Sequence, residues 1–344
     1  MPSQMRILVI RAGALGDTLM ATPVLPALAQ RYPGARIDVV ASAAAAPLLH
    51  GHPAIAETFT LHRRNLPYLV SPEKRRLVAK LRRGAYDLAI VLEHAARYYE
   101  LAERARIGRI TGFRETPFDP ALHSVANNLR AAGFADWAAR SWEMPIALTD
   151  RDDRELPAAI RDAVRPLVGL HAGYGPGHRK REQEQRLRGW ALENFAAVGQ
   201  WLAARGAALV LTGSPEDRSS VERLARMLPS DAVIDLAGRT GVRGLAALIR
   251  RLTVLVSVDA GPAHVAAALG TPLVVLWGPG IYDQTRPLAT RGPVEIVREP
   301  VECAPCYGTP MMRACQRNIC MEGIAPARVI AAVVRLSPLG SPGG

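Results

Sequence analysis

The residues with the clearest chemical potential lie in Ser257–Pro272, which reads SVDAGPAHVAAALGTP. The β-branched run Val254–Val258 predicts a strand, and the alanine-rich segment that Gly270 ends predicts a helix. A second buried strand is predicted from Leu273. Parallel sheets bind ligands at the carboxyl ends of their strands, where the next helix presents unpaired backbone N–H groups. The pattern therefore predicts an anion-binding turn.

Two interpretations of this turn are open. In a phosphate site, Gly261 lets the backbone approach the anion closely. In an ordinary helix start, Asp259 caps the N-terminus before a Gly-Pro pair, and His264 is a core or surface histidine. The motif alone favours the ordinary helix start, and only the rest of the chain shifts the balance toward phosphate.

A second candidate is Asp17, at the mouth of another strand–helix–strand unit. Arg6–Ile10 predicts a buried strand, Thr18–Arg31 a helix and Ile37–Val40 the next strand. The glycine spacing before Asp17 is G-x-x-G, which matches neither the dinucleotide-binding motif nor a P-loop. Asp17 is either the helix N-cap, worth about 1 kcal/mol, or a general base that takes a proton from a hydroxyl.

Further polar residues follow the strand predicted over Ala85–Leu92. Glu93 and His94 stand at its carboxyl end, Arg97 opens a basic helix, and His123 opens an amphipathic segment. Because the carboxyl ends of parallel strands share one edge of a sheet, these groups predict a binding site for a second substrate.

The strongest charge run is His178–Arg188. By itself it is typical of a solvated loop. It follows a predicted strand end, however, and a guanidinium pairs bidentately with phosphate oxygens, so Arg188, which lies nearest the next helix, is the candidate phosphate ligand.

All four cysteines, Cys303, Cys306, Cys315 and Cys320, lie close together near the C-terminus. One C-x-x-C pair with two further cysteines permits a tetrahedral zinc site, but the spacing is looser than that of a zinc ribbon. Reduced thiols that pack a C-terminal turn are the favoured interpretation, with metal or disulfide as alternatives.

The formal net charge of +12 favours acidic partners such as phosphates or an anionic membrane face. With 5% aromatic residues and scattered charge runs, nucleic-acid binding is not expected. The N-terminus lacks a signal-peptide pattern, and no apolar run reaches the length of a membrane span. We expect a cytoplasmic protein that could touch a membrane surface.

The length of 344 residues suits two domains. Strands and helices alternate, which predicts an α/β fold of two doubly wound, Rossmann-like domains facing across a cleft. A composition shift near Asp150–Glu155 places the domains at residues 1–160 and 161–336, with residues 337–344 as a disordered tail.

Together these motifs resemble glycosyltransferase family 9, which contains the lipopolysaccharide heptosyltransferases. The most specific matches are Gly16-Asp17 and the Asp259-x-Gly261-x-x-His264 pattern. The other matching segments follow the family's order along nearly the whole chain: Tyr86–Glu93, Gly108–Phe113, His171–Gly173, Arg188–Trp190, Thr212–Arg218, Asp235–Leu248 and Cys303–Val329.

The resemblance implies a GT-B architecture in which the first domain binds the acceptor and the second binds a nucleotide sugar. It implies an inverting transfer without metal or cofactor, with Asp17 as general base. The donor ligands it implies are the backbone of Asp259, Ala260 and Gly261 with His264 in support, Arg188 where the family usually has Lys, Gly213 near the ribose and Thr240 facing the nucleoside. Glu93 stands where the family tends to have Asp.

The function that this resemblance predicts is transfer of a heptose, or a related sugar, from an ADP-linked donor to a lipopolysaccharide core or similar anionic glycolipid at the inner membrane face. Two alternatives stay open. One is a GT-B enzyme that uses another nucleotide sugar, or a sugar-nucleotide epimerase. The other is a non-catalytic protein that binds anionic glycolipid.

Overall fold

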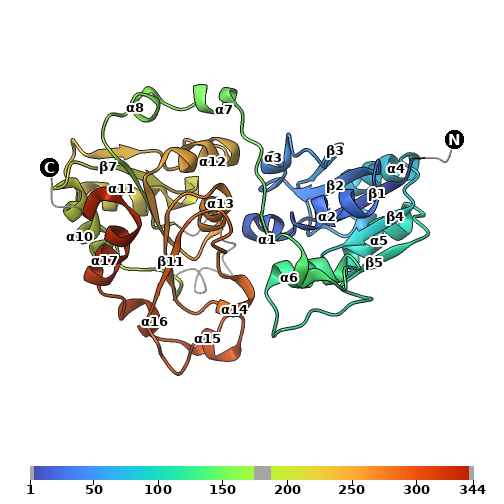
Figure 1. The fold of residues 1–344 in the computed structure, drawn as a ribbon. Helices are drawn as coiled ribbons and strands as arrows, with labels where there is room; N and C mark the ends of the chain where they lie inside the picture. The colour runs from blue at the N-terminus through green and yellow to red at the C-terminus, as the bar shows by residue number, and fades with distance from the viewer. Residues whose placement is uncertain (1–3, 174–186, 341–344) are drawn as a thin grey trace. The chain divides into compact units, whose positions relative to one another are not determined.

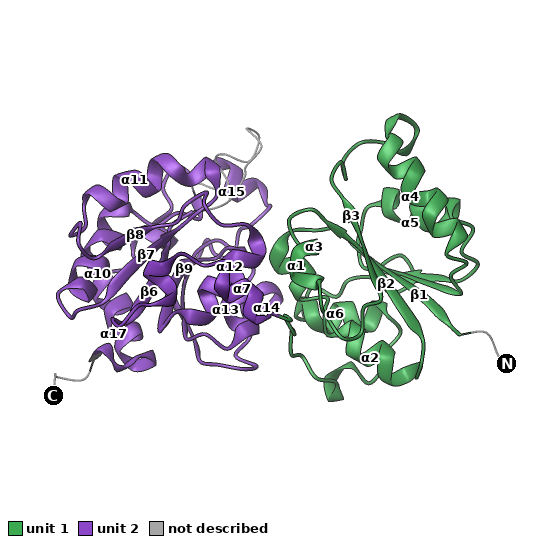
Figure 2. Ribbon diagram, turned by 90° about the horizontal axis from the view of Figure 1, so that it is seen from above, with its two compact units in different colours: residues 1–147 green, residues 148–344 purple. Residues whose placement is uncertain are grey.

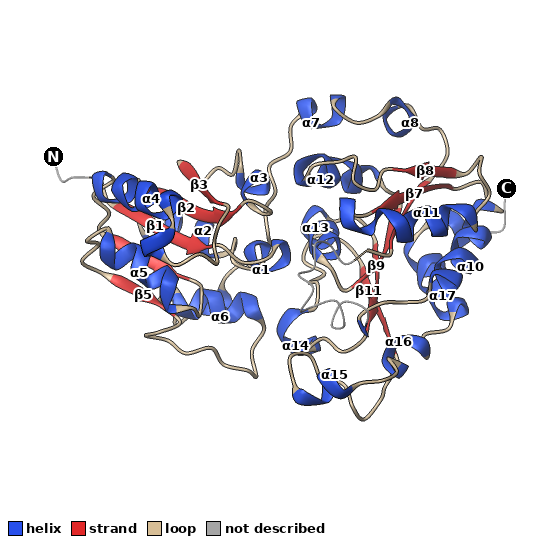
Figure 3. Cartoon of the chain, turned by 180° about the vertical axis from the view of Figure 1, so that it is seen from behind, coloured by secondary structure: helices blue, strands red, loops and turns tan. Residues whose placement is uncertain are grey.

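The computed structural model describes residues 4–173 and 187–340. The chain divides into two compact units, Met1–Ala147 and Leu148–Gly344, shown in green and purple in Figure 2. Each unit is a parallel β-sheet with helices packed on it (Figures 1 and 3). No helix in the described part of the chain is both long and apolar enough to span a membrane.

Unit 1 is built on a five-stranded sheet of order β3-β2-β1-β4-β5, and every strand pair is parallel. Its elements are β1 Arg6–Arg11, α1 Leu15–Leu19, α2 Val24–Arg31, β2 Arg36–Ser42, α3 Ala46–Leu49, β3 Glu57–Leu61, the 3₁₀ turn η1 Tyr68–Val70, α4 Pro72–Arg83, β4 Leu88–Val91, α5 Ala96–Arg104, β5 Ile110–Gly112, α6 Ser124–Ala131 and the 3₁₀ turn η2 Trp137–Ala139.

The central strands of unit 1 are apolar because helices cover both faces of the sheet. Leu8 and Ile10 of β1 share a buried cluster with Leu77 and Leu81 of α4 and with Tyr99 of α5. Figure 2 shows α2 and α6 on the opposite face of the same sheet. This arrangement leaves the carboxyl edge of the sheet to the loops that carry the candidate residues.

The single helix predicted over Thr18–Arg31 is wrong, because the chain forms two helices there, α1 and α2. Pro23 has no N–H to donate to a preceding turn, and the backbone from Met20 to Pro23 turns before α2 begins. Thr22 Oγ1 donates to the carbonyl of Leu19 at 2.8 Å within this turn. Asp17 consequently lies inside the short helix α1 and not in front of a long one.

Unit 2 is built on a six-stranded parallel sheet of order β11-β10-β9-β6-β7-β8. Its elements are α7 Asp150–Arg154, α8 Ala158–Arg161, β6 Leu167–His171, α10 Leu192–Ala203, β7 Ala208–Thr212, η4 Pro215–Asp217, α11 Arg218–Arg226, β8 Val233–Asp235, α12 Val242–Arg251, β9 Val254–Val258, α13 Gly261–Leu269, β10 Leu273–Trp277, α14 Tyr282–Thr285, β11 Val294–Arg298, α15 Pro310–Ala314, α16 Ile319–Glu322, α17 Pro326–Leu336 and η5 Pro338–Gly340.

The core of unit 2 lies between its sheet and the helices α10, α11 and α17. Phe195 and Leu202 of α10, Leu224 of α11 and Val329 of α17 all belong to one buried cluster with the strands. The other face is covered by α13, which packs on β9, β10 and α12. Because α13 is buried in this way, the position of its N-terminus at the sheet edge is fixed by packing.

The structural division falls between Ala147 and Leu148, earlier in the chain than the boundary at residue 160 that the composition suggested. The reason is α7, whose acidic residues contact unit 2. Arg243 of α12 donates through Nη2 to Asp152 at 2.8 Å, and Arg250 Nη2 lies 2.6 Å from Asp153. The charged stretch that resembled a linker is therefore part of the second unit.

The predicted disordered tail is wrong for residues 337–340. Ser337 Oγ donates to the carbonyl of Val333 at 2.8 Å, and the turn η5 follows. Leu339 is 8% exposed and joins the apolar cluster of unit 2, which fixes this turn against the sheet layer. Residues 341–344 lie outside the described residues.

Candidate active site

The predicted donor residues of unit 2 follow four strands that lie side by side in the order β9-β6-β7-β8. Asp259 follows β9, Gly213 follows β7, and Thr240 lies in the loop after β8. Between them, His171 is the last residue of β6. The parallel sheet thus brings residues that are distant in sequence to one edge.

The turn into α13 differs from an ordinary capped helix start. The N-cap residue is Ala260, no side chain caps the helix, and Gly261 and Pro262 open its first turn. The interpretation of Asp259 as the cap is therefore wrong, because its carboxylate turns to the Arg188 guanidinium, 2.7 Å from Nη2. Pro262 has no N–H, and the N–H of Ala263 donates to the carbonyl of Ala260 at 3.1 Å, so at this helix start Gly261 presents the backbone N–H that an anion could accept from.

Arg188 is held firmly at this turn. Its Nη2 also donates to the backbone carbonyl of Asp259, and its guanidinium lies 5.4 Å from the ring centre of Tyr307. Its Nε is buried and has no hydrogen-bond partner among the described residues. The guanidinium therefore keeps N–H groups that an anion could accept from. The remainder of the charged run, His178–Arg186, lies outside the described residues.

The segment around Arg188 is fastened by residues much later in the chain. Asn318 Nδ2 donates to the carbonyl of Gly189 at 2.9 Å, and Trp190 Nε1 donates to the carbonyl of Ile324 at 2.9 Å. Leu187 packs in a small cluster with Cys306 and Met312. The C-terminal part of unit 2 consequently sets the place of the guanidinium.

Gly280 makes room for the Asp259 carboxylate. A Cβ atom at this position would lie 2.9 Å from Asp259 Oδ2 and 2.9 Å from the Trp277 ring. That spacing is closer than van der Waals contact permits, so a larger residue would displace the carboxylate from Arg188.

The loops that carry Gly213 and Thr240 are tied to each other. The N–H of Gly238 donates to the carbonyl of Gly213 at 2.9 Å, which joins the loops after β7 and β8. Ser214 donates through both its N–H and its Oγ to Asp217, at 2.8 and 2.7 Å. Thr240 is half-buried in front of α12. Both residues thus stand on structured backbone at the sheet edge.

His171 is a residue that the sequence placed at the strand end without a role. It is 4% exposed, and its Nδ1 lies 2.9 Å from Thr212 Oγ1. Burial lowers its pKa to about 4, so the imidazole is neutral near pH 7. Its position at the end of a central strand was visible in the sequence, but its partner on β7 was not.

His264 is buried inside α13, with 5% of its surface exposed. It lies one turn after the N-terminus of that helix, as the sequence predicted. Its imidazole therefore supports the α13 layer from within, and a direct ligand contact stays a prediction.

In unit 1, Asp17 occupies the first turn of α1, and the N-cap is Ala14. Asp17 Oδ2 accepts a hydrogen bond from the Ala14 N–H at 3.3 Å, and its Oδ1 lies 3.5 Å from Arg11 Nη2. The side chain of Asp17 is 43% exposed, whereas that of Arg11 is 11% exposed. Asp17 is thus oriented by the backbone and by a buried cation while its carboxylate stays open to solvent.

Arg11 is a residue of the candidate site that the sequence reasoning missed. Its Nε donates to the Asp17 carbonyl at 3.2 Å, and its Nη1 donates to the carbonyl of Leu92. It therefore joins the end of β1, the start of α1 and the end of β4. The G-x-x-G loop gave no signal for this, because Leu92 is distant in sequence.

Glu93 lies on the other side of the same loop. A Cβ atom at Gly13 would be 3.3 Å from both Asp17 Oδ2 and Glu93 Oε1, so the glycine lets the two carboxylates approach one point. Burial and the nearby charge of Asp17 raise the pKa of Glu93, although Arg11 opposes this. Its Oε1 is buried and has no hydrogen-bond partner in the described residues.

The remaining predicted acceptor residues differ in their surroundings. His94 stacks on Phe113 with 4.5 Å between ring centres, and partial desolvation of the imidazole lowers its pKa although the residue as a whole is exposed. Arg97 is exposed on α5 over the Tyr98 ring. His123 is only 6% exposed, and its Nδ1 accepts from the N–H of Val125 as the N-cap of α6. The structure gives His123 a helix-capping role, and acceptor contact by it stays a prediction.

The four cysteines line one small cavity of about 20 Å³ and carry free thiols. Burial raises the pKa of Cys306, and it raises that of Cys320 to about 11, so both are protonated near neutral pH. Among the described residues no group of three or more His, Cys, Asp or Glu side chains is arranged to hold a metal ion.

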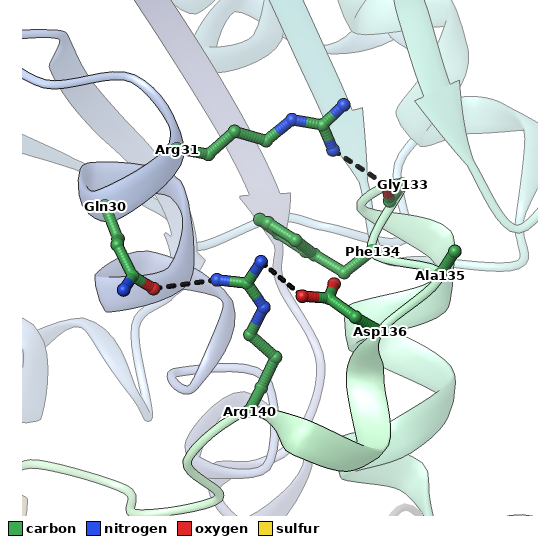
Figure 4. Close-up of a pocket in the computed structure, with 7 residues that line it drawn as sticks. All are labelled: Gln30, Arg31, Gly133, Phe134, Ala135, Asp136 and Arg140. Atoms are coloured by element: carbon green, nitrogen blue, oxygen red, sulfur yellow. Dashed lines mark hydrogen bonds and ion pairs between the residues drawn. The ribbon is translucent and has the colours of Figure 1, made fainter.

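A larger hollow of about 440 Å³ lies elsewhere on unit 1 (Figure 4). It is formed where α2 ends and where the chain leaves α6, and the Phe134 ring lies between the guanidinium groups of Arg31 and Arg140. Arg140 contacts Asp136 at 2.6 Å and Gln30 at 2.7 Å. Helices that follow strands run back across the sheet, so this hollow lies at the amino edge and not at the candidate site.

Comparison with known proteins agrees with this arrangement. Residues 181–315 match the family model of glycosyltransferase family 9 (heptosyltransferase). Lipopolysaccharide heptosyltransferase 2 of Salmonella typhimurium is 29% identical over 319 residues, which cover 84% of this chain and 87% of that protein. The Escherichia coli protein of the same name is 28% identical, with the same two shares. The resemblance to glycosyltransferase family 9 that the sequence indicated is confirmed by these matches.

The structure of E. coli ADP-heptose lps heptosyltransferase II superimposes on this chain with a TM-score of 0.77. The match covers 96% of this chain and 98% of that one, at 25% identity. The predicted α/β class and the GT-B architecture of two Rossmann-like domains are thereby confirmed. The chain is a glycosyltransferase, and the prediction of an enzyme is confirmed as well.

Proposed function

We propose that this glycosyltransferase transfers a heptose, or a related sugar, from an ADP-linked donor to a lipopolysaccharide core or similar anionic glycolipid. The names of the relatives support this substrate class, since two are lipopolysaccharide heptosyltransferases and a third is an ADP-heptose enzyme. We further propose that the reaction is a single inverting displacement without a metal ion.

The observation that carries the proposal is the environment of Asp17. A general base must be accessible to the acceptor hydroxyl and must be held in one orientation. The Asp17 carboxylate is 43% exposed, while the Ala14 N–H and the Arg11 guanidinium hold it from behind. We assign to it the removal of the acceptor proton as that oxygen attacks the anomeric carbon.

The leaving group in this reaction is a nucleoside diphosphate, on which negative charge develops as the glycosidic bond breaks. Two groups at the unit 2 sheet edge suit that charge. They are the N-terminus of α13, with the backbone N–H of Gly261, and the remaining N–H groups of Arg188, including its buried Nε. These cationic and dipolar groups would do what a divalent metal does in other transferases, and this supports a metal-independent reaction.

The acceptor side of the proposal uses Asp17 together with Glu93, His94 and Arg97, and retains His123 as a candidate. The Glu93 carboxyl approaches the same point as Asp17 and has an oxygen that could accept a hydrogen bond from a sugar hydroxyl. Arg97 is an exposed cation suited to acidic groups of the glycolipid. In this proposal the enzyme works at the cytoplasmic face of the inner membrane.

Calorimetry with ADP, UDP and GDP tests the donor first. We expect binding of ADP alone in the micromolar range or tighter. Transfer from ADP-heptose to a lipid A precursor carrying its first core sugars, followed by NMR of the anomeric configuration, tests the reaction. Activity should persist in excess EDTA with inverted configuration. Preferential binding of UDP or GDP, or a retained configuration, would refute the donor or the mechanism.

A further inference from the structure

The segment His62–Val70, between β3 and α4, exposes large apolar side chains in an unusual concentration. Leu69 is 72% exposed, Val70 63% and Leu66 37%. They lie within five positions of one another in the sequence. In Figure 2 the segment that joins β3 to α4 projects at the margin of unit 1. A grouped apolar tip of this kind indicates an interaction surface.

The backbone of this segment is held in place from inside the unit. The buried Lys74 donates through Nζ to the carbonyls of Arg64 and Leu66, at 3.0 and 2.5 Å. Glu73 accepts from the N–H groups of His62 and Arg63, at 2.7 and 2.8 Å. Burial lowers the pKa of Lys74, so placing its ammonium here costs free energy that these two acceptors offset. The apolar tip is thus presented on a structured loop.

Positive charge surrounds the tip. Residues 62–83 contain eight Lys or Arg residues and a single acidic residue, Glu73, which is occupied by the backbone of the loop. The basic residues with exposed side chains are Arg63, Arg75, Arg76, Lys80, Arg82 and Arg83. Much of the formal net charge of +12 is therefore concentrated beside the exposed apolar residues.

We propose that this surface, defined by Leu66, Leu69 and Val70 with the exposed basic residues of 63–83, docks on a bilayer that contains anionic phospholipid. The apolar side chains enter the boundary between headgroups and acyl chains, and the guanidinium and ammonium groups meet lipid phosphates. A second copy of the chain is a poorer occupant, because two such basic surfaces repel one another.

The docking surface is connected to the candidate acceptor site inside unit 1. Arg64 Nη1 donates to the carbonyl of Ala12 at 3.0 Å, immediately before the loop that carries Asp17. An acceptor glycolipid that is anchored in the same bilayer would reach Asp17 beside this loop, a consequence that rests on the proposed function. The docking itself depends only on the exposed residues and their charge.

Flotation of the full chain with vesicles tests the proposal, in the absence of donor and acceptor. We expect binding to vesicles of phosphatidylcholine with phosphatidylglycerol, little binding to phosphatidylcholine alone, and weaker binding as salt is raised. The double variant Leu69→Asp/Val70→Asp should bind about tenfold less tightly. The matched control is Val164→Asp, since Val164 is 99% exposed in unit 2, and it should bind like the wild type.

A second variant, Arg76→Gln/Lys80→Gln/Arg83→Gln, separates charge from apolar contact, and we expect it to lose most of the salt-sensitive binding. Absence of wild-type binding to anionic vesicles would overturn the proposal. Equal binding by the Leu69/Val70 variant, or equal binding to neutral vesicles, would do the same. A dimer in light scattering that the Leu69/Val70 variant abolishes would reassign the surface to self-association. ADP calorimetry on the same samples shows separately whether the donor assignment holds.

Discussion

Both units place an arginine–aspartate pair at the carboxyl end of a sheet, but the two pairs are built in opposite ways. In unit 1, Arg11 is the buried partner and Asp17 is the exposed one, with 3.5 Å between Nη2 and Oδ1. In unit 2, Asp259 is 13% exposed, Arg188 is 26% exposed, and the two side chains meet at 2.7 Å.

The difference indicates which member of each pair reacts with substrate. A buried, tightly paired group serves to orient its partner, whereas the more exposed group is available to a ligand. From this comparison we propose that unit 1 presents a carboxylate for proton transfer and that unit 2 presents a guanidinium for phosphate. The same two residue types would then present opposite charges in the two units.

The sharpest test is Asp17→Asn, which keeps the shape of the exposed partner and removes its basicity. We expect kcat to fall by about a thousandfold, within the range for loss of a general base, while ADP affinity measured by calorimetry stays unchanged. Asp136→Asn is the matched control, because Asp136 lies in the hollow at the amino edge of the sheet. Turnover of the Asp17 variant close to wild type would remove the base assignment.

The next test addresses the exposed partner in unit 2. Arg188→Ala should weaken ADP binding by about tenfold or more, because a hydrogen bond to a charged group is worth about 1.5–3 kcal/mol. Arg188→Lys should lose less, since it retains the charge without the fork of donors. Arg226→Ala, an exposed arginine on α11, serves as the control. If calorimetry gives the same ADP affinity for all three variants, the comparison between the units fails.

A smaller effect is expected at Glu93, whose folded-state pKa is raised above its ordinary value of 4.5 by burial and by Asp17. A carboxyl of this kind binds more protons in the folded state, so it lowers stability as pH rises through 4.5 toward the folded pKa. The melting temperature of Glu93→Gln minus that of the wild type should therefore be larger at pH 7 than at pH 4. An exposed control, Glu143→Gln, should show no such trend, and a trend of opposite sign would contradict the buried carboxyl.

The smallest effects concern the cysteines beneath the Arg188 segment. Cys306 and Cys320 are buried, with raised pKa values, so they should react with a thiol reagent more slowly than the partly exposed Cys303 and Cys315. Mass spectrometry after timed alkylation at pH 7 gives the order. Stoichiometric zinc in purified protein, or rapid labelling of Cys320, would contradict free protonated thiols.

The sequence was informative where burial is complete. The apolar runs of β1, β2, β4, β9 and β10 predicted strands, and the ends of β1 and β9 correctly located Asp17 and Asp259 beside helix starts. The edge strands β3 and β11 were not predicted, because their mixed polar and apolar residues suit a half-exposed position and resemble loops. Sequence periodicity carries little information at such edges.

Contacts between distant residues were the other part that could not be predicted. The pairing of Asp152 with Arg243 joins positions 91 residues apart. Because of it, the second unit begins at Leu148 and not after residue 160, where the sequence placed the boundary. The Asp17 position was predictable from its strand end, but the Arg11 contacts with Leu92 depend on the β1–β4 pairing. The cap role of Asp259 was one interpretation of its local sequence, but in the structure its carboxylate pairs with Arg188, which is distant in sequence.

The anchoring of the Arg188 segment has a consequence for biosynthesis. The side-chain amide of Asn318 donates to the carbonyl of Gly189, which lies 129 positions earlier in the chain. The carbonyl of Ile324 accepts from the indole N–H of Trp190, which lies 134 positions earlier. A ribosome-bound chain that ends before Asn318 already contains α13, yet it lacks the two hydrogen bonds that position the segment around Arg188. The Arg188 segment can therefore take its place at the turn before α13 only after residues 318–324 have been made.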